Sequence, residues 1–383
     1  MDDSRLLQRF NAEIGSARSL LEADCLRAQR AAYRARIGEF ERADADLATL
    51  HARYDGKPRA AISAWIHLAE GLRSHYTDLG HAARDKIQRA HALSTAAGLT
   101  SIQALCAAWL AHLAYLRMDA AAIARHVAQA LALATPEDHA AQSRAHLVVA
   151  QALDEAGRVD LAKPWYERAH LHATTEGDDA TVSAMMWNRA ALRLATLRQV
   201  SCSGGDATAL REQVRLHIDS TDRFDSWRKV QSLQSLQRIL RAQYLAETGA
   251  HAQALALFDA HLDEALSQGL GGIASVLMAD RAWCRLQLGD RDAALDAARH
   301  AEAHLHQALT HGDRAPAHSR LAQVFVALTR EQEAQRHQAL ASAAWQGHVN
   351  DQTLLLQALA PLTPLGASGD GADQNSVMLS RRR

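Results

Sequence analysis

Histidine is the most unusual residue type in this sequence, and it is the one that could bind a metal ion. The chain of 383 residues contains 21 histidines, and the densest run comprises His300, His304, His306, His311 and His318. His300 and His304 are four positions apart, a spacing that places two imidazoles on one helical face, where they can hold zinc. The run alternates with Ala and Leu, however, and the sequence has no HExxH motif. We therefore expect packed or solvated histidines, and we keep a metal-dependent enzyme built on residues 300–318 as an alternative.

Other residues that could carry chemistry do not form a catalytic pattern. The glycine-rich segments 203–206 and 269–272 are not preceded by a strand, which a phosphate-cradling loop of the dinucleotide-binding kind requires. There is no GxSxG nucleophile motif and no Walker A motif. The adjacent carboxylates Asp154-Glu155 and Asp178-Asp179 fall at helix ends. We expect the second pair to cap a helix, and nothing in the sequence forces a raised pKa on either pair. The sequence predicts a protein that is not an enzyme and needs no metal or other cofactor.

The composition indicates that helices position all of these residues. Alanine, the best helix former, fills roughly a fifth of the chain. The strongest helix breakers are scarce, with six prolines and twenty glycines. The four cysteines are far apart and form no CxxC motif, so we expect reduced, packed thiols. The predicted fold class is all-α.

The charge balance and the N-terminal segment limit the expected partners and compartment. Lys and Arg number 42 against 43 Asp and Glu, so no net field would attract nucleic acid or an anionic membrane. The N-terminal residues MDDSRLLQRFNAEIG are acidic and lack the apolar region of a secretory signal. The most apolar stretch, 102–116, contains Gln103 and His112 and is short for a membrane span. We expect a cytoplasmic protein that binds neither nucleic acid nor membrane.

A pattern that recurs about every 40 residues organises the chain. In each copy a helix ends near Gly or Asp, and an alanine five residues later opens a second helix, most clearly after Gly157, Gly249 and Gly289. The marker alanines are separated by 40, 41, 38, 92, 40 and 40 residues, and they are Ala43, Ala83, Ala124, Ala162, Ala254, Ala294 and Ala334. The gap of 92 fits two longer units with Ala209 as the missing marker. A fixed period of this kind is typical of helical repeat proteins.

The first helix of two units has its own signature. The patterns Trp65-x2-Leu68-Ala69-x2-Leu72 and Trp187-x2-Ala190-Ala191-x2-Leu194 place large and small apolar residues on one helical face. Together with the Gly and Ala offsets, they resemble the tetratricopeptide repeat (TPR), over roughly residues 20–345. The period is longer than the 34 residues of the short TPR, as in extended arrays of bacterial regulators. The resemblance implies a right-handed superhelical solenoid of antiparallel helix pairs. HEAT-like and Sel1-like repeats remain alternatives.

The repeat frame divides the chain into five parts. We predict an N-terminal capping helix in residues 1–20 and TPR-like repeats in 21–198. After an irregular loop, further repeats fill 199–346, a C-terminal capping helix covers 347–360, and 361–383 is a disordered tail. Each helix pair would bury its apolar stripe against its neighbours.

The resemblance also implies a binding surface, because the first helices of a TPR-like superhelix line its concave face. The repeat frame places on that face Glu70, Arg73, Trp109, Arg117, Gln151, Asn188, Gln243 and Trp283. Aromatic, Arg, Asn and Gln side chains suit a groove for peptides. We therefore expect a scaffold or adaptor that binds a protein or peptide partner there. The alternative is a signal-sensing regulatory module that acts in trans on a transcription regulator or a nucleotide-signalling enzyme.

Overall fold

The structure, a computed structural model, describes residues 4–78, 82–202, 205–232 and 234–363. Within these ranges it contains seventeen α-helices, three short 3-10 helices and no strand. This confirms the all-α class that the alanine content predicted. Of the tail predicted at 361–383, residues 364–383 lie outside the described residues. The helices are α1 (Arg5–Ser16), α2 (Leu20–Ile37), α3 (Phe40–Tyr54), α4 (Ala60–Asp78), α5 (Ala82–Ala96), α6 (Thr100–Tyr115), α7 (Ala120–Leu133), α8 (His139–Glu155), α9 (Val159–Glu176), α10 (Asp179–Cys202), α11 (Thr208–Arg228), α12 (Gln234–Glu247), α13 (His251–Ser267), η1 (Leu270–Ile273), α14 (Ala274–Gln287), α15 (Arg291–His304), η2 (Leu305–Gln307), α16 (His311–Ala327), α17 (Glu331–Leu359) and η3 (Ala360–Leu362).

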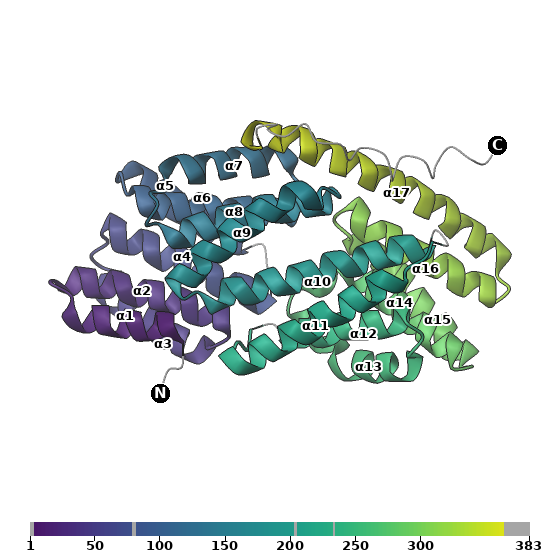
Figure 1. The fold of residues 1–383 in the computed structure, drawn as a ribbon. Coiled ribbons are helices and arrows are strands. Elements are labelled where there is room, and N and C mark those ends of the chain that lie inside the picture. Colours follow the sequence, from purple (N-terminus) through teal and green to yellow (C-terminus); the bar gives the residue numbers. More distant parts are fainter. Residues whose placement is uncertain (1–3, 79–81, 203–204, 233, 364–383) are drawn as a thin grey trace.

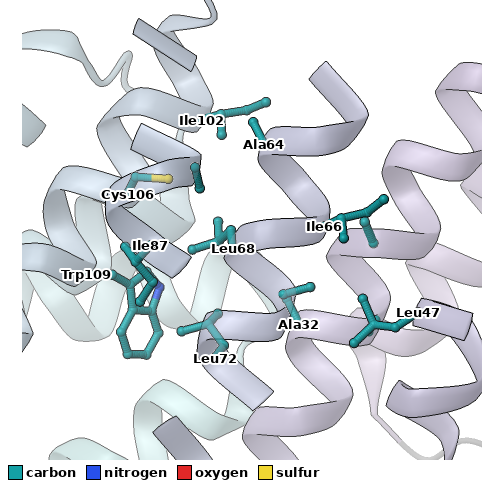
Figure 2. Packing of buried hydrophobic residues seen from close by; sticks show 14 of the residues in the cluster. Ala32, Leu47, Ala64, Ile66, Leu68, Leu72, Ile87, Ile102, Cys106 and Trp109 are labelled. Carbon is teal, nitrogen blue, oxygen red and sulfur yellow. The ribbon is translucent and has the colours of Figure 1, made fainter. Parts of the chain in front are cut away.

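The helices pack in neighbouring pairs (Figure 1). Each even-numbered helix from α2 to α16 packs against the odd-numbered helix that follows it, and those from α2 to α14 also contact the next even-numbered helix. Apolar side chains fill the space between the pairs. In the first part of the chain, for example, Leu68 and Leu72 of α4 lie beside Trp109 of α6 (Figure 2). Pairwise packing agrees with the predicted repeats, and a right-handed solenoid stays a prediction.

The alanines that marked the repeat are mostly core residues. Six of the seven are buried, namely Ala43, Ala83, Ala162, Ala254, Ala294 and Ala334. In the copy that follows Asp119, Ala124 is only partly buried, and Ile123 and Val127 make the core contact instead. Ala209, the marker expected in the long gap, is exposed, whereas Ala207 is buried. The marker position of the repeat is thus a buried one in six of its seven copies.

Glycine ends the first helix of the clearest repeats for a conformational reason. Gly157, Gly249 and Gly289 have φ of +74°, +86° and +89°, a left-handed conformation that glycine adopts without a steric penalty. At Gly157 the turn closes with two backbone bonds. Its own N–H donates to the carbonyl of Asp154 at 2.9 Å, and that of Arg158 donates to Leu153 at 2.8 Å. These bonds satisfy carbonyls at the helix end.

Two helices run through boundaries that the sequence predicted. The helix α10 continues to Cys202, into the loop expected at 198–206, and Asp206 then accepts a bond from the backbone N–H of Thr208 at 2.9 Å. The residues expected to form a separate closing helix, 347–360, continue the 29-residue helix α17. At 1.5 Å per residue α17 is roughly 43 Å long, which lets it reach well beyond its partner α16.

The C-terminal half of α17 returns to the middle of the chain. It contacts α7 and α8 and extends over them in Figure 1. Leu355 and Leu359 are fully buried in the hydrophobic cluster of α6–α9, and the Gln352 side chain donates to the carbonyl of Glu155 at 2.7 Å. The helices therefore make contacts beyond nearest-neighbour stacking.

A second long-range contact joins the end of α2 to the segment before α12. The backbone N–H of Gln231 donates to the carbonyl of Ile37 at 2.9 Å, and the Ser232 hydroxyl donates to that of Arg36 at 2.7 Å. Gly38, with φ of +89°, lies so close that a Cβ atom would be 2.6 Å from the Ser232 nitrogen. The two contacts bring both halves of the chain around a shared interior.

Candidate functional site

The interior contains a cavity of about 360 Å³, within the range of small-molecule sites. Its walls come from the end of α6 and from α8, α10, α12, η1, α14, α16 and α17. Helices far apart in sequence share this cavity because α17 folds back over α7 and α8. Most of the lining is apolar, and the polar and aromatic side chains include Tyr115, Glu155, Trp187, Asn188, Gln243, Asp313, Trp345, His348 and Gln352.

Glu155 is the most unusual residue in this cavity, which we call the central cavity. It is the last residue of α8, where the helix dipole disfavours a negative charge. Its side chain is 20% exposed, and no nitrogen of a described lysine or arginine lies within 4.0 Å of its carboxylate. The nearest basic nitrogen is His348 Nε2 at 3.9 Å. Burial, and next the charge of Asp313, raise the pKa of Glu155 to about 7.

Nothing in the sequence indicated a raised pKa in the pair Asp154-Glu155, and the surroundings of Glu155 supply the cause. The two neighbours differ because they point to different surroundings. Asp154 accepts bonds from the Arg193 guanidinium and, at 3.2 Å, from the Tyr166 hydroxyl. Glu155 shares a hydrogen bond with the Tyr115 hydroxyl. A titratable carboxyl without a cationic partner, facing a cavity, is typical of functional sites.

Asp313 caps the N-terminus of α16, which explains its position. It belongs to the capping box of α16, and its carboxylate accepts from the Thr310 hydroxyl at 2.6 Å and from the Thr310 backbone N–H at 3.2 Å. Burial raises the pKa of Asp313 despite these bonds. Its charge in turn makes ionisation of Glu155 less favourable.

Two polar nitrogens of the lining, Trp187 Nε1 and His348 Nδ1, are buried with neither a hydrogen bond nor an ion pair among the described residues, whereas Arg198 Nε lies 3.1 Å from Glu247. Burial lowers the pKa of His348, and its Nε2 lies 3.1 Å from the Gln352 amide nitrogen. Gly312 leaves room for this imidazole, because a Cβ at that position would be 3.1 Å from His348 Nδ1. Buried polar groups normally have partners, so these nitrogens are available to a ligand.

The structure brings two of the eight predicted binding residues to the central cavity, Asn188 and Gln243. Trp109 and Gln151 are buried elsewhere along α6 and α8, and Arg117 is exposed in the turn after α6. Glu70 pairs with His51 and Lys86 at 2.7 Å and 2.9 Å.

The remaining two predicted residues also contact neighbouring helices. Arg73 pairs with Asp44 at 2.9 Å. Trp283 is partly buried, and the guanidinium carbon of Arg320 lies 5.3 Å from the centre of its ring. The repeat frame alone could not predict which residues meet, because that depends on how the two halves fold together.

The sequence analysis did not identify Glu155, His348 and Gln352. Trp187, which the repeat signature placed on an apolar helical face, packs against the hydrophobic core and also lines the cavity. The local signal at Glu155 was an acidic residue in the last turn of a helix, two residues before the glycine that ends it. No signal indicated His348 and Gln352, because only the return of α17 brings them to α8.

The histidine run at 300–318 is not assembled into one site. The His304 Nδ1 lies 2.8 Å from the carbonyl of His300, whereas His311 pairs with Asp351 and His318 contacts His337, both at 2.9 Å. The described residues contain no group of three or more His, Cys, Asp or Glu side chains that could hold a metal ion. None of the described helices combines the length and the apolar character that crossing a membrane would require.

Comparison of the chain with protein-family models, with curated proteins and with solved structures gave no match.

Proposed function

We propose that this chain is a non-enzymatic, long-period TPR-like module that senses a small ligand or a short peptide segment in the central cavity. In this proposal it acts in trans on a regulator or a signalling enzyme. The observation that carries the proposal is Glu155, a partly buried carboxyl without a Lys or Arg partner among the described residues, in a cavity that α17 helps to line. A ligand with a positively charged or hydrogen-bond-donating group would complete this environment.

The chemistry of the lining supports binding rather than catalysis. Tryptophan, tyrosine, asparagine and glutamine side chains give contact area and orienting hydrogen bonds. The described lining residues include no cysteine, serine or lysine, three of the side chains that can act as activated nucleophiles.

The adaptor function predicted from the sequence would require α17 to move. A protein segment laid along the inner surface would require α17 to leave α7 and α8, where Leu355 and Leu359 are buried. The substitution Leu355→Asp should release that end of the helix, because a buried charge is unfavourable. An adaptor would then bind its partner more tightly, whereas a sensor would lose its ligand.

Filling the cavity tests the proposal. Ala195 lines the cavity and is exposed, so Ala195→Trp should extend into the cavity without displacing the core. The matched control is Ala121→Trp, at an exposed position on α7 outside the cavity. We expect a screen of small metabolites and short peptides by thermal shift to find compounds that stabilise the wild type and the control, but not Ala195→Trp. A screen without stabilising compounds, or equal stabilisation of all three proteins, would contradict the proposal.

A further inference from the structure

A second, smaller cavity of about 70 Å³ lies near the other end of α8. Its walls come from α1, α2, α4, α6, α8 and the segment that joins α9 to α10. The side chains of Arg36, Trp109 and Arg144 face it, and Phe10 of α1 covers part of it. Gln29, Trp65 and Glu176 also line it and are partly exposed, so the cavity opens to solvent beside α1. We call it the basic cavity.

Arg144 is buried in this cavity without a counter-ion. It is 2% exposed, and the described residues place no carboxylate within 4.0 Å of its guanidinium. Its Nε has no hydrogen-bond partner among them, and one of its terminal nitrogens lies 3.5 Å from the Thr181 hydroxyl. Two contacts compensate the positive charge of Arg144 in part. Its guanidinium carbon lies 4.0 Å from the centre of the Trp109 ring, and the guanidinium shares a hydrogen bond with Tyr76.

Arg36, the second arginine of the cavity, is paired with both carboxylate oxygens of Asp178. Its two terminal nitrogens bind both oxygens of Asp178, at 2.8 Å and 3.0 Å. Asp178 also accepts a bond from the backbone N–H of Thr181 at 2.9 Å, which confirms the helix cap predicted there. Although burial opposes it, the charge of Arg36 holds the pKa of Asp178 below its ordinary value.

The other charged groups around the cavity are also paired. Asp179 binds Arg228 at 2.9 Å, and Glu176 binds Arg9 of α1. From α4 and α6, His75 and His112 face the same region, and burial followed by Arg144 lowers the pKa of His75 to about 3 and that of His112 well below its ordinary value. Neutral histidines cannot balance the charge of Arg144. The region therefore keeps an excess of one positive charge beside a cavity.

An excess buried charge is unfavourable unless a partner of opposite sign is present. Arginine guanidinium groups bind carboxylate and phosphate through parallel hydrogen bonds. The cavity is also larger than the space that a single water molecule requires.

From these observations we propose that Arg144 and Arg36 bind a small anionic group, the carboxylate or phosphate of a ligand, in the basic cavity. This site is separate from the central cavity and does not depend on the function proposed for it.

The proposal is tested by titrating the full chain with sodium phosphate and, separately, with sodium acetate. Sodium chloride at matched ionic strength serves as the reference, and both calorimetry and the melting temperature are recorded. We expect one saturable site per chain, and the stronger of the two anions shows which group the site prefers. Arg144→Met should weaken binding at least about tenfold. The control Arg73→Met removes the same charge from the partly exposed pair with Asp44 and should bind like the wild type.

A second variant keeps the test decisive if Arg144→Met fails to fold. Arg144→Lys retains the charge but lacks the planar fork of donors, so it should also bind more weakly than the wild type. Ala195→Trp, which fills only the central cavity, should leave anion binding unchanged. The proposal is overturned if the wild type shows no saturable site, or if the Arg144 variants bind both anions as tightly as Arg73→Met does.

Discussion

Two buried clusters of arginine and carboxylate lie in different parts of this chain, and they differ in charge balance. The first cluster contains Arg36 and Arg144 with the single carboxylate of Asp178. The second contains Arg198 and Arg320 with two carboxylates, and each arginine binds both. Arg198 Nε lies 3.1 Å from Glu247, Arg320 Nε lies 3.1 Å from Asp280, and the crossed pairs are Arg198–Asp280 and Arg320–Glu247.

The comparison distinguishes buried charges that hold helices together from a buried charge that is suited to bind a ligand. The balanced cluster connects α10, α12, α14 and α16, and each of its four members has two partners of opposite charge. Both clusters are deeply buried and both adjoin a cavity, because Arg198 lines the central cavity, but the unbalanced cluster leaves Arg144 without a described carboxylate within 4.0 Å. A buried ion pair therefore does not by itself indicate a site, whereas an unpaired charge beside a cavity does.

The largest effect is expected from breaking the balanced cluster. Arg198→Met leaves two buried carboxylates with one arginine, and removing one partner of a buried pair typically lowers the free energy of unfolding by about 3–5 kcal/mol. Urea unfolding followed by circular dichroism measures the change. A loss below about 1 kcal/mol would show that this cluster is not structural in the sense argued above.

Glu155 resembles Arg144 in having no partner of opposite charge among the described residues, but it is acidic. Its substitution should change how the free energy of unfolding depends on pH. Its pKa is about 7 in the folded chain against an ordinary value of 4.5, so the folded chain binds more protons than the unfolded chain between these values. Stability of the wild type should therefore fall, relative to Glu155→Gln, as the pH rises from about 4.5 to 7. Below this window the difference should be constant, and across the window it should change by at most about 3 kcal/mol.

Unfolding curves of the wild type and Glu155→Gln at several pH values test this prediction. The control is Glu212→Gln at an exposed position on α11, which should give no such difference in the same window. A difference between the wild type and Glu155→Gln that stays constant from pH 4 to pH 8 would contradict the assignment.

A smaller effect is expected from removing the unpaired arginine. Without added anion, Arg144→Met loses the contact with Trp109 and a hydrogen bond, but it also removes an uncompensated charge. We expect the free energy of unfolding to fall by no more than about 2 kcal/mol. Urea unfolding in a buffer without phosphate or carboxylate measures it. A loss as large as that of Arg198→Met would remove the distinction between the two clusters.

The smallest effect is expected at a partly exposed pair. Arg73→Ala breaks the ion pair with Asp44, whose side chain is 53% exposed, and the contact with the Phe40 ring at 4.4 Å. Such pairs typically contribute up to about 1 kcal/mol. Thermal and urea unfolding should show a change within that limit. A larger loss would mean that Arg73 supports the packing of α3 on α4 more than its exposure indicates.

Local patterns predicted the helices well, because each depends on nearby residues. The alanine content predicted the all-α class, and the offset from Gly157 to Ala162 correctly placed a helix end and a buried contact. The cavity residues could not be predicted in this way. Glu155 and His348 are 193 positions apart, and they meet only because α17 is long enough to return to α8. Similarly, nothing local distinguishes Arg144 from an arginine on a solvated helical face.

The contact of α17 with α7 and α8 also limits how the number of helix pairs can vary. An open stack of helix pairs can gain or lose a pair, because each pair touches only its neighbours. Here an inserted pair between α8 and α17 would move the tip of α17 by about 10 Å, the usual distance between packed helices. Leu355 and Leu359 would then miss the pocket that buries them. The number of pairs in this interval is therefore fixed, as the number of strands is fixed in a closed barrel.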